Sequence, residues 1–298
     1  MTGRATDTVV VPERGTALRR SAVLRAGDQG FLWIRRAGPR APAPLHTLDR
    51  GTRADIAALS TPAGSRLVTG TDAGRWRGFP VRAAHSLLEE IATGRRPSGG
   101  PVLAALEELG RLLRLLHDHV PPAALPPAPA SLDRLRHRPE NGRGPSPRAV
   151  EILTAVQDGI TPRRRTLLRQ WTDDLSDGDV ATHGWCGLGQ VAAEAGGPLD
   201  LTVGDDMGRA ARELDLGFVI GQLRELETFA AAPGMPLREA ATRLLRAYGP
   251  CDARRAARAA ALGVALHIHD FACYFDVDDA EIPVWTALLS DLVDEAAA

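Results

Sequence analysis

The sequence predicts an α+β protein in which a strand-rich N-terminal part precedes a larger, mostly helical part. Residues 8–84 contain short apolar runs separated by Gly, Pro and Asp residues, a pattern typical of strands and turns. Residues 85–298 contain longer runs whose apolar positions recur every three or four residues, which indicates amphipathic helices. We therefore expect an N-terminal unit at residues 1–84 and a C-terminal unit at residues 85–298.

The composition limits the classes of function. The 298 residues are 44% hydrophobic and 24% charged, as in an ordinary soluble globular protein. A net charge of −1 provides no basic face for a nucleic-acid backbone, and no apolar run approaches the roughly 20 residues of a membrane-spanning helix. The polar N-terminus is unlike a signal peptide, and the three cysteines lack the spacing of a metal site. We expect a cytoplasmic protein that binds neither nucleic acid nor membrane.

Arginine supplies all 36 basic residues, and lysine is absent. A GC-rich genome explains this bias through codon usage. The bias has a chemical consequence, because no residue of the chain can be a catalytic or phosphate-binding lysine.

Strands, one helix and several turns are predicted in the N-terminal unit. A loop that ends in Gly30 separates the second and third strands, which predicts a hairpin. A short helix is expected at residues 54–59, and the last two strands flank a turn at residues 72–74. The predicted strands are residues 8–11, 21–24, 31–34, 66–69 and 78–83.

The clearest helix is at residues 101–119, where leucines fall on one face at three- and four-residue spacing. The Pro-rich segment 121–147, with a short helix at residues 131–138, is locally basic. It is either a flexible surface loop or a docking site for an acidic or phosphorylated peptide. Further helices are predicted at residues 86–91, 148–158, 162–175, 214–231, 236–247, 252–275 and 282–295.

One stretch interrupts the helical pattern. A loop that begins at His183 leads into two β-type runs, at residues 190–194 and 199–203, which a Gly-Gly turn separates as in a hairpin. An acidic pair, Asp205 and Asp206, follows the second run, and the next helix begins shortly after it.

This layout resembles the catalytic region of aminoglycoside-phosphotransferase-like kinases, which have a protein-kinase-like fold. Their pattern is His-Gly-Asp-x-x-x-x-Asn, a hairpin, a metal-binding Asp, and then Asp-Leu at the start of a helix. The resemblance implies a small antiparallel β N-lobe and a larger helical C-lobe that contains a catalytic-loop-like hairpin at residues 181–206. It also makes ATP and Mg²⁺ the candidate cofactors.

Several positions depart from the family pattern. The loop Asp, which accepts the proton of the substrate hydroxyl, is replaced by Trp185, whose indole is a donor only. Gln190 stands where the family has its metal-binding Asn, and Val203 where it has its metal-binding Asp. Asp205 and Asp206 lie two and three residues further on. They either bind Mg²⁺ or cap a turn or a helix.

The resemblance also identifies residues that would position the loop and contact phosphate. His183 matches the loop histidine, and Asp215 matches the helix-start Asp that hydrogen-bonds the loop. Arg35 stands where the family has its phosphate-contacting Lys, and the alternative is a solvent-facing Arg on an edge strand. Between the first two strands only Gly15 is available for a phosphate-cradling loop.

Three functions remain open. The sequence around Trp185 is similar to that of phosphotransferase-like subunits from actinobacterial gene clusters for lanthipeptide-like and thioamide-containing peptides. This implies action with a lyase-like protein partner in the dehydration of Ser and Thr in a ribosomally made precursor peptide. The alternatives are a catalytically dead pseudokinase scaffold that binds a partner or peptide, and a small-molecule kinase of the aminoglycoside type. Trp185 and Val203 argue against the small-molecule kinase.

Overall fold

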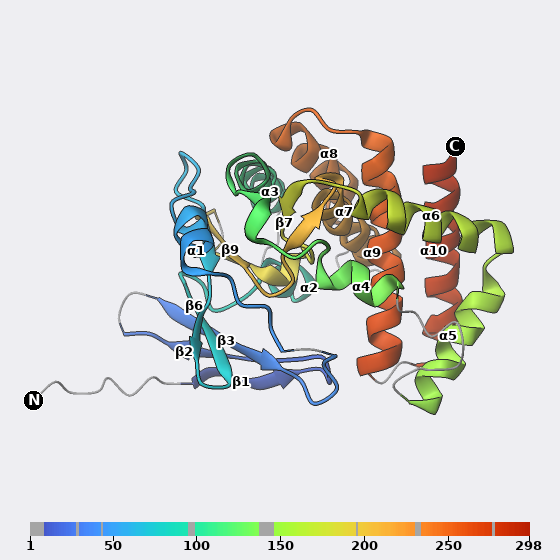
Figure 1. Ribbon diagram of the computed structural model, residues 1–298, viewed down its shortest axis with the longest axis horizontal. Helices are drawn as coiled ribbons and strands as arrows, with labels where there is room; N and C mark the ends of the chain where they lie inside the picture. The colour runs from blue at the N-terminus through green and yellow to red at the C-terminus, as the bar shows by residue number, and fades with distance from the viewer. Residues whose placement is uncertain are drawn as a thin grey trace, which may run out of the picture.

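The computed structural model describes residues 9–27, 30–42, 44–94, 99–136, 146–194, 196–229, 234–275 and 278–298. The predicted α+β architecture is confirmed, because a β-sheet formed by N-terminal residues packs beside a larger helical part (Figure 1). Parts of some predicted elements, residues 8, 137–138 and 230–231, lie outside the described residues.

The N-terminal sheet is antiparallel. Its strands are β1 (Val9–Gly15), β2 (Arg19–Arg25), β3 (Phe31–Ala37), β5 (Thr71–Ala73) and β6 (Trp76–Val81), in the order β1-β2-β3-β6-β5. The predicted hairpin at residues 21–34 is confirmed, because β2 and β3 pair from end to end. Alternate residues of a strand face the same side, and on β3 these include the buried residues Trp33 and Arg35.

One predicted strand does not belong to this sheet. Residues 66–69 form β4 (Arg66–Thr69), but β4 pairs in parallel with β9 (Leu199–Val203) of the C-terminal part. The neighbour of β6 is instead β5, which covers residues expected to form a turn. A local reason is that Leu67 and Val68, on opposite faces of β4, are both buried. The two parts of the chain therefore share a small sheet, and the boundary expected at residue 84 stays a prediction.

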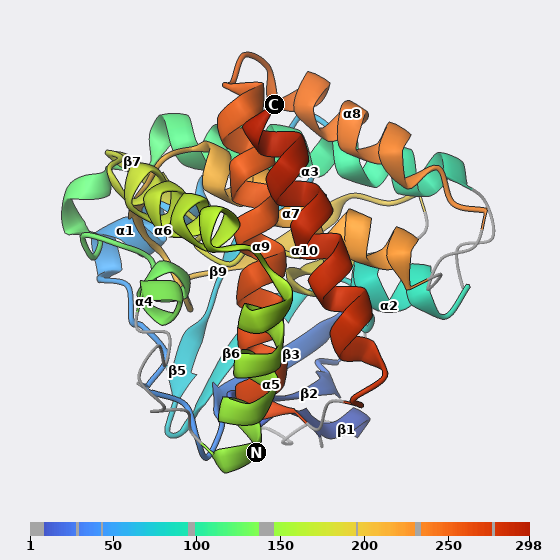
Figure 2. The same cartoon turned by 90° about the vertical axis from the view of Figure 1, so that its right-hand side faces the viewer.

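The C-terminal part is built around α3 (Gly99–His119), α7 (Glu213–Thr228) and α9 (Ala253–Tyr274). α7 packs closely on α9, since a Cβ on Gly217 would lie 2.3 Å from the Ala259 Cβ. The other helices described are α1 (Arg50–Ala57), α2 (Leu87–Ala92), α4 (Ala130–Arg136), α5 (Pro147–Gly159), α6 (Pro162–Ser176), α8 (Leu237–Tyr248) and α10 (Glu281–Ala297). Figure 2 shows α5, α9 and α10 side by side. Among the helices of the described ranges, none combines the length and apolar character needed to cross a bilayer.

Two small sheets position the stretch that interrupts the helices. The predicted hairpin is confirmed, because β8 (Val191–Ala193) runs antiparallel to β9. A second antiparallel pair is formed by β7 (Val180–Thr182), which precedes this hairpin in the sequence, and β10 (Gly208–Ala210), which follows it. The loop from residue 183 to 190 leaves β7, and the acidic pair follows β9. Both segments therefore lie at the border between the N-terminal sheet and the helical part.

Candidate functional site

A buried carboxylate, Asp215, anchors the loop that follows β7. It lies in the first turn of α7 and accepts hydrogen bonds from the backbone N–H groups of His183 (2.7 Å) and Gly184 (2.9 Å). It also accepts one from His117 Nε2 (2.9 Å). Burial alone would raise the pKa of Asp215, but the hydrogen bond from His117 lowers this pKa overall, so the carboxylate stays ionised. The two residues expected to anchor the loop, His183 and Asp215, are thus in contact.

The His183 ring fixes the loop against β9. Its Nε2 donates to the Thr202 carbonyl oxygen (2.9 Å), and its Nδ1 accepts from the Trp185 backbone N–H (3.3 Å). Burial lowers the pKa of His183, which favours the neutral ring that this pattern of one donor and one acceptor requires. His183 is a structural part of the loop.

Trp185 is held by packing. The Arg134 guanidinium carbon lies 4.6 Å from the indole centroid, and the His267 ring centroid lies 6.0 Å from it. A cation–π contact of this kind contributes about 0.5–2 kcal/mol. An indole accepts no proton, so the residue at the position of the family's general base contributes packing and not proton transfer.

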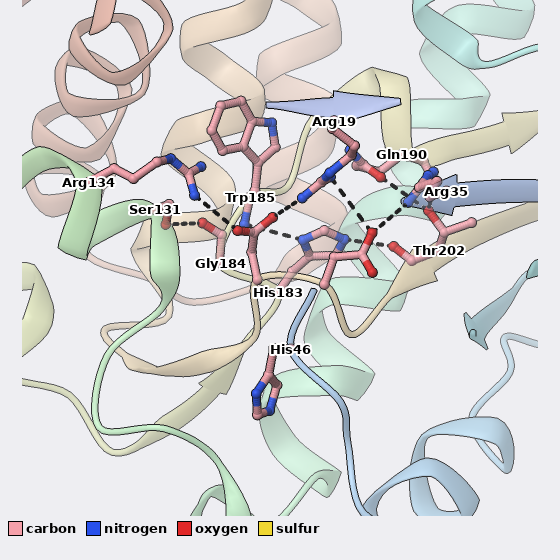
Figure 3. Close-up of polar contacts among 12 residues, drawn as sticks. Arg19, Arg35, His46, Ser131, Arg134, His183, Gly184, Trp185, Gln190 and Thr202 are labelled. Carbon is pink, nitrogen blue, oxygen red and sulfur yellow. Dashed lines mark hydrogen bonds and ion pairs between the residues drawn. The ribbon is translucent and has the colours of Figure 1, made fainter. Parts of the chain in front are cut away.

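Asp205 is buried against three arginines from adjacent strands of the N-terminal sheet. The Arg77 Nη1 lies 2.9 Å from Asp205 Oδ1, and the Arg35 Nη1 lies 3.4 Å from Oδ2. The Arg19 Nη1 lies 3.8 Å from the same Oδ2. Figure 3 shows the side chains of Arg19 and Arg35 directed toward carboxylates that lie beside the His183 ring. Asp205 therefore neutralises buried cations of the N-terminal sheet.

Asp206 connects two further elements. Its carboxylate accepts a hydrogen bond from Arg19 Nη2 on β2 and another from Arg134 Nη1 on α4 (3.2 Å). Burial alone would raise the pKa of Asp206, but the charges of Arg19 and Arg134 lower this pKa well below its ordinary range. Asp206 is therefore ionised at every physiological pH and joins the sheet to α4.

The alternative in which Arg35 is a solvent-facing residue of an edge strand is wrong. β3 lies between β2 and β6, and Arg35 is only 5% exposed. Besides Asp205 it contacts Thr202, whose hydroxyl oxygen accepts from Arg35 Nη2 at 2.9 Å. Burial lowers the pKa of Arg35 to about 10, so the side chain remains a cation at neutral pH.

These contacts do not suit a Mg²⁺ ion, which prefers oxygen ligands in a near-octahedral arrangement. Asp205 and Asp206 both accept from arginines. The Thr202 hydroxyl has a single hydrogen, and the Gln190 backbone carbonyl oxygen (2.9 Å) is a nearer acceptor for it than the Gln190 amide oxygen (3.3 Å). Within the described residues, no group of three or more His, Cys, Asp or Glu side chains is arranged to hold a metal ion. The acidic pair acts here as a set of counter-ions.

The turn between β1 and β2, at residues 15–19, has used its backbone donors. The Thr16 N–H donates to the Arg19 carbonyl oxygen (2.8 Å). The N–H groups of Leu18 and Arg19 donate to Thr16 Oγ1 (3.0 and 3.1 Å). The Ala17 N–H donates to the Tyr274 carbonyl oxygen at the end of α9 (3.2 Å). A phosphate-cradling loop needs free N–H groups that point at the ligand, and this turn instead closes onto the helical part.

Three cavities meet at Arg19. The first, of about 350 Å³, lies under β2 and β3 and reaches Ser86 and Gln190. The second, of about 180 Å³, lies between the β1–β2 turn and the end of α9, beside Trp185. The third, of about 480 Å³, lies on the other side of the acidic pair and has prolines in its walls. Arg19 lines all three cavities, whereas its partner Asp206 lines only the third.

Asp270 is a site residue that the sequence did not indicate. It lines the cavity beside Trp185, and its Oδ1 lies 2.9 Å from His269 Nδ1 and 3.4 Å from Arg134 Nε. Its Oδ2 is buried and has no hydrogen-bond partner among the described residues. Arg19 and Arg77 were missed as well. Each is a single charged residue on a separate element, so no local pattern marks any of the three.

Comparisons with known proteins identify the fold. No protein-family model matches the sequence, and no curated protein matches it. Among solved structures, an ethanolamine kinase from Plasmodium vivax has a TM-score of 0.51 at 11% identity, covering 98% of this chain and 83% of its own. A spectinomycin phosphotransferase in complex with ADP and spectinomycin has a TM-score of 0.50 at 11% identity, covering 98% and 92%. The choline kinase LicA from Streptococcus pneumoniae has a TM-score of 0.50 at 11% identity, covering 93% and 89%.

The chain therefore has the protein-kinase-like fold that these small-molecule phosphotransferases share. The likeness at 11% identity concerns the fold alone. The chemistry of the cleft has to be argued from this chain's own residues.

Proposed function

We propose that this chain is a kinase-fold binding subunit whose cleft does not carry out metal-dependent phosphoryl transfer. The supporting observation is that Asp205 and Asp206 are both paired with buried or half-buried arginines. To bind Mg²⁺, these carboxylates would have to give up their contacts with guanidinium groups inside the protein. Breaking a buried ion pair in this way costs about 3–5 kcal/mol.

The phosphate-binding elements support the same proposal. The β1–β2 turn donates its N–H groups to Thr16, Arg19 and Tyr274, which leaves them engaged within the protein. Arg35, at the position of the family's lysine, is held by Asp205 and Thr202. The general base is thus replaced, and the candidate metal ligands and the phosphate-binding turn are engaged in contacts within the protein. This combination is expected of a scaffold that is retained for its shape.

We place this subunit, by the resemblance of the sequence around Trp185, in the modification of a ribosomally made precursor peptide. Its partner there is a lyase-like protein that removes water from Ser and Thr. Elimination requires an activated hydroxyl as the leaving group, so in this proposal a separate enzyme supplies the activating group. This chain contributes the binding of the peptide.

The proposal is tested by mixing the purified chain with a fluorescent precursor peptide and measuring anisotropy, without nucleotide and then with Mg²⁺-ATP. We expect saturable binding whose Kd does not change with Mg²⁺-ATP, and no phosphopeptide in the mass spectrum. A nucleotide at about 100 times its Kd would stabilise the chain by ~2.7 kcal/mol, so a thermal-shift titration is a sensitive second readout. A phosphopeptide formed by the chain alone would refute the proposal.

A small-molecule kinase is the second candidate, and one observation favours it. Asp270 lines the cavity beside Trp185, and its buried Oδ2 has no hydrogen-bond partner in the described part of the chain, so a carboxylate is present beside the position of the missing base. If the chain phosphorylates any hydroxyl compound, Asp270→Asn should slow that reaction by about 10²–10⁴, the usual contribution of a general base. In the binding-subunit proposal there is no such reaction for the substitution to slow.

A further inference from the structure

Trp33 occupies a position of special importance in the cleft. It precedes Arg35 by two residues on β3, so both side chains point to the same face of the sheet. In protein kinases the corresponding residue, two before the lysine of the V-A-I-K sequence, is an alanine. Here a large indole, 6% exposed, replaces it.

The indole has a polar partner in the connection between the sheet and the helical part. Trp33 Nε1 donates to the Ala83 carbonyl oxygen at 3.0 Å, in a buried contact. Ala83 lies between β6 and α2, and the next residues of this connection, Ala84 and Ser86, line the 350 Å³ cavity together with Trp33. The indole N–H therefore occupies the Ala83 carbonyl oxygen. Without the indole, this oxygen could accept a hydrogen bond from an N–H group of a flat heterocyclic ligand.

The surroundings are suited to a flat ring. Val23 of β2 and Leu88 of α2 line the cavity with apolar surface, and the Arg35 guanidinium carbon lies 5.6 Å from the Trp33 ring centroid. Charged and polar side chains, among them Arg14, Glu89 and Gln190, line other parts of the cavity. Apolar surface combined with a few placed polar groups is usual for a site that holds a planar heterocycle. In this chain the planar ring at the Ala83 carbonyl is the indole of Trp33, a side chain of the protein itself.

We propose that Trp33 is an internal occupant of the base-binding position, which excludes purine nucleosides from the cleft. This inference rests on the proposed function, since it explains how a kinase fold avoids competition from nucleotides. Shortening the side chain frees the Ala83 carbonyl and adds its volume to the 350 Å³ cavity. The 350 Å³ cavity is already larger than the apolar void of about 150 Å³ that admits benzene, so its volume alone does not exclude a purine. The exclusion concerns the place of the indole, because a ring that donates to the Ala83 carbonyl has to lie there.

The experiment uses adenosine, which has no phosphate and so makes no demand on the acidic pair or on the β1–β2 turn. Adenosine is titrated by calorimetry into the wild-type chain and into the variants Trp33→Ala, Trp33→Val and Trp33→Phe. Trp33→Val is included because a β-branched residue suits a strand and keeps a folded variant available. Trp33→Phe is the matched control, since it removes the N–H but leaves a ring that fills the space.

We expect adenosine to bind Trp33→Ala and Trp33→Val at least about ten-fold more tightly than the wild type or Trp33→Phe, and to raise the melting temperature of both. Free indole should compete for the same site. Unchanged affinity in a folded Trp33→Ala or Trp33→Val variant would overturn the inference, and so would tight binding of adenosine to the wild type. Phosphoryl transfer by the wild-type chain would instead refute the proposed function, so the two failures are distinguishable.

Discussion

Replacing Asp205 by Asn tests whether the acidic pair is a structural counter-ion. At an effective dielectric constant of about 20, one unit charge about 3 Å from another contributes roughly 5 kcal/mol of gross Coulomb attraction. Asp205 has two such neighbours, Arg77 at 2.9 Å and Arg35 at 3.4 Å. Most of this attraction offsets the cost of burying the charges. Without Asp205, Arg77 keeps its ion pair with Asp72 (2.8 Å), but the buried Arg35 loses its carboxylate. The penalty of leaving a buried cation without its partner is about 3–5 kcal/mol.

We therefore expect Asp205→Asn to lower the free energy of unfolding by about 3–5 kcal/mol, measured by urea denaturation monitored by circular dichroism. The matched control is Asp279→Asn, which removes an acidic partner of Arg148. The Asp279 side chain is 72% exposed and that of Arg148 is 49% exposed, so this substitution should leave the unfolding curve unchanged. If Asp205→Asn is as stable as the wild type, the carboxylate is free to bind a metal ion, and the reasoning about the cleft is wrong.

Four further predictions follow from individual contacts. Asp215→Ala removes the acceptor of two buried backbone N–H groups and of His117 Nε2, so it should cost about 3 kcal/mol or more in urea unfolding; a loss under about 1 kcal/mol would contradict the anchor. Trp185→Asp restores the family's residue but should give no ATP turnover in a coupled ADP-release assay, and turnover would contradict the loss of metal binding. Because the folded pKa of Asp206 lies below the ordinary 3.8, its contribution to stability is fully present above about pH 4 and is lost as pH falls; the unfolding curves of wild type and Asp206→Asn should therefore converge in acid. Burial lowers the pKa of His267, but Glu225 raises it overall, so the pair stabilises fully below pH 6.5 and less as pH rises through the raised value. Glu225→Gln should lower the pKa that NMR measures for the His267 ring, and an unchanged pKa would exclude the pair as its cause.

Local sequence patterns were sufficient to predict elements whose apolar spacing and turn residues lie within a short stretch of the chain. The helix at residues 101–119 and the hairpin at residues 190–203 were predicted with nearly the observed bounds, α3 and β8–β9. In both cases the apolar period and the turn residues lie within the element itself. The contact between the loop and Asp215 spans 32 residues and was predicted from the resemblance to the kinase family, not from a local pattern.

Contacts between distant segments could not be predicted in this way. β4 pairs with β9, so that Arg66 lies opposite Asp200, and nothing near residue 66 indicates a parallel partner so far along the chain. The partners of Asp205 are also distant, since Arg19 and Arg77 come from different strands that only the folded sheet brings together. In a chain whose basic residues are all arginine, two isolated arginines carry no signal.

Whether the wild-type cleft binds Mg²⁺-ATP is the most direct test of the proposed function. Isothermal titration of the purified chain with Mg²⁺-ATP to millimolar concentration measures this without any knowledge of the substrate. We expect no saturable heat, because the turn, the acidic pair and Trp33 are all engaged within the protein. Saturable binding of Mg²⁺-ATP to the wild-type chain would contradict the proposed function.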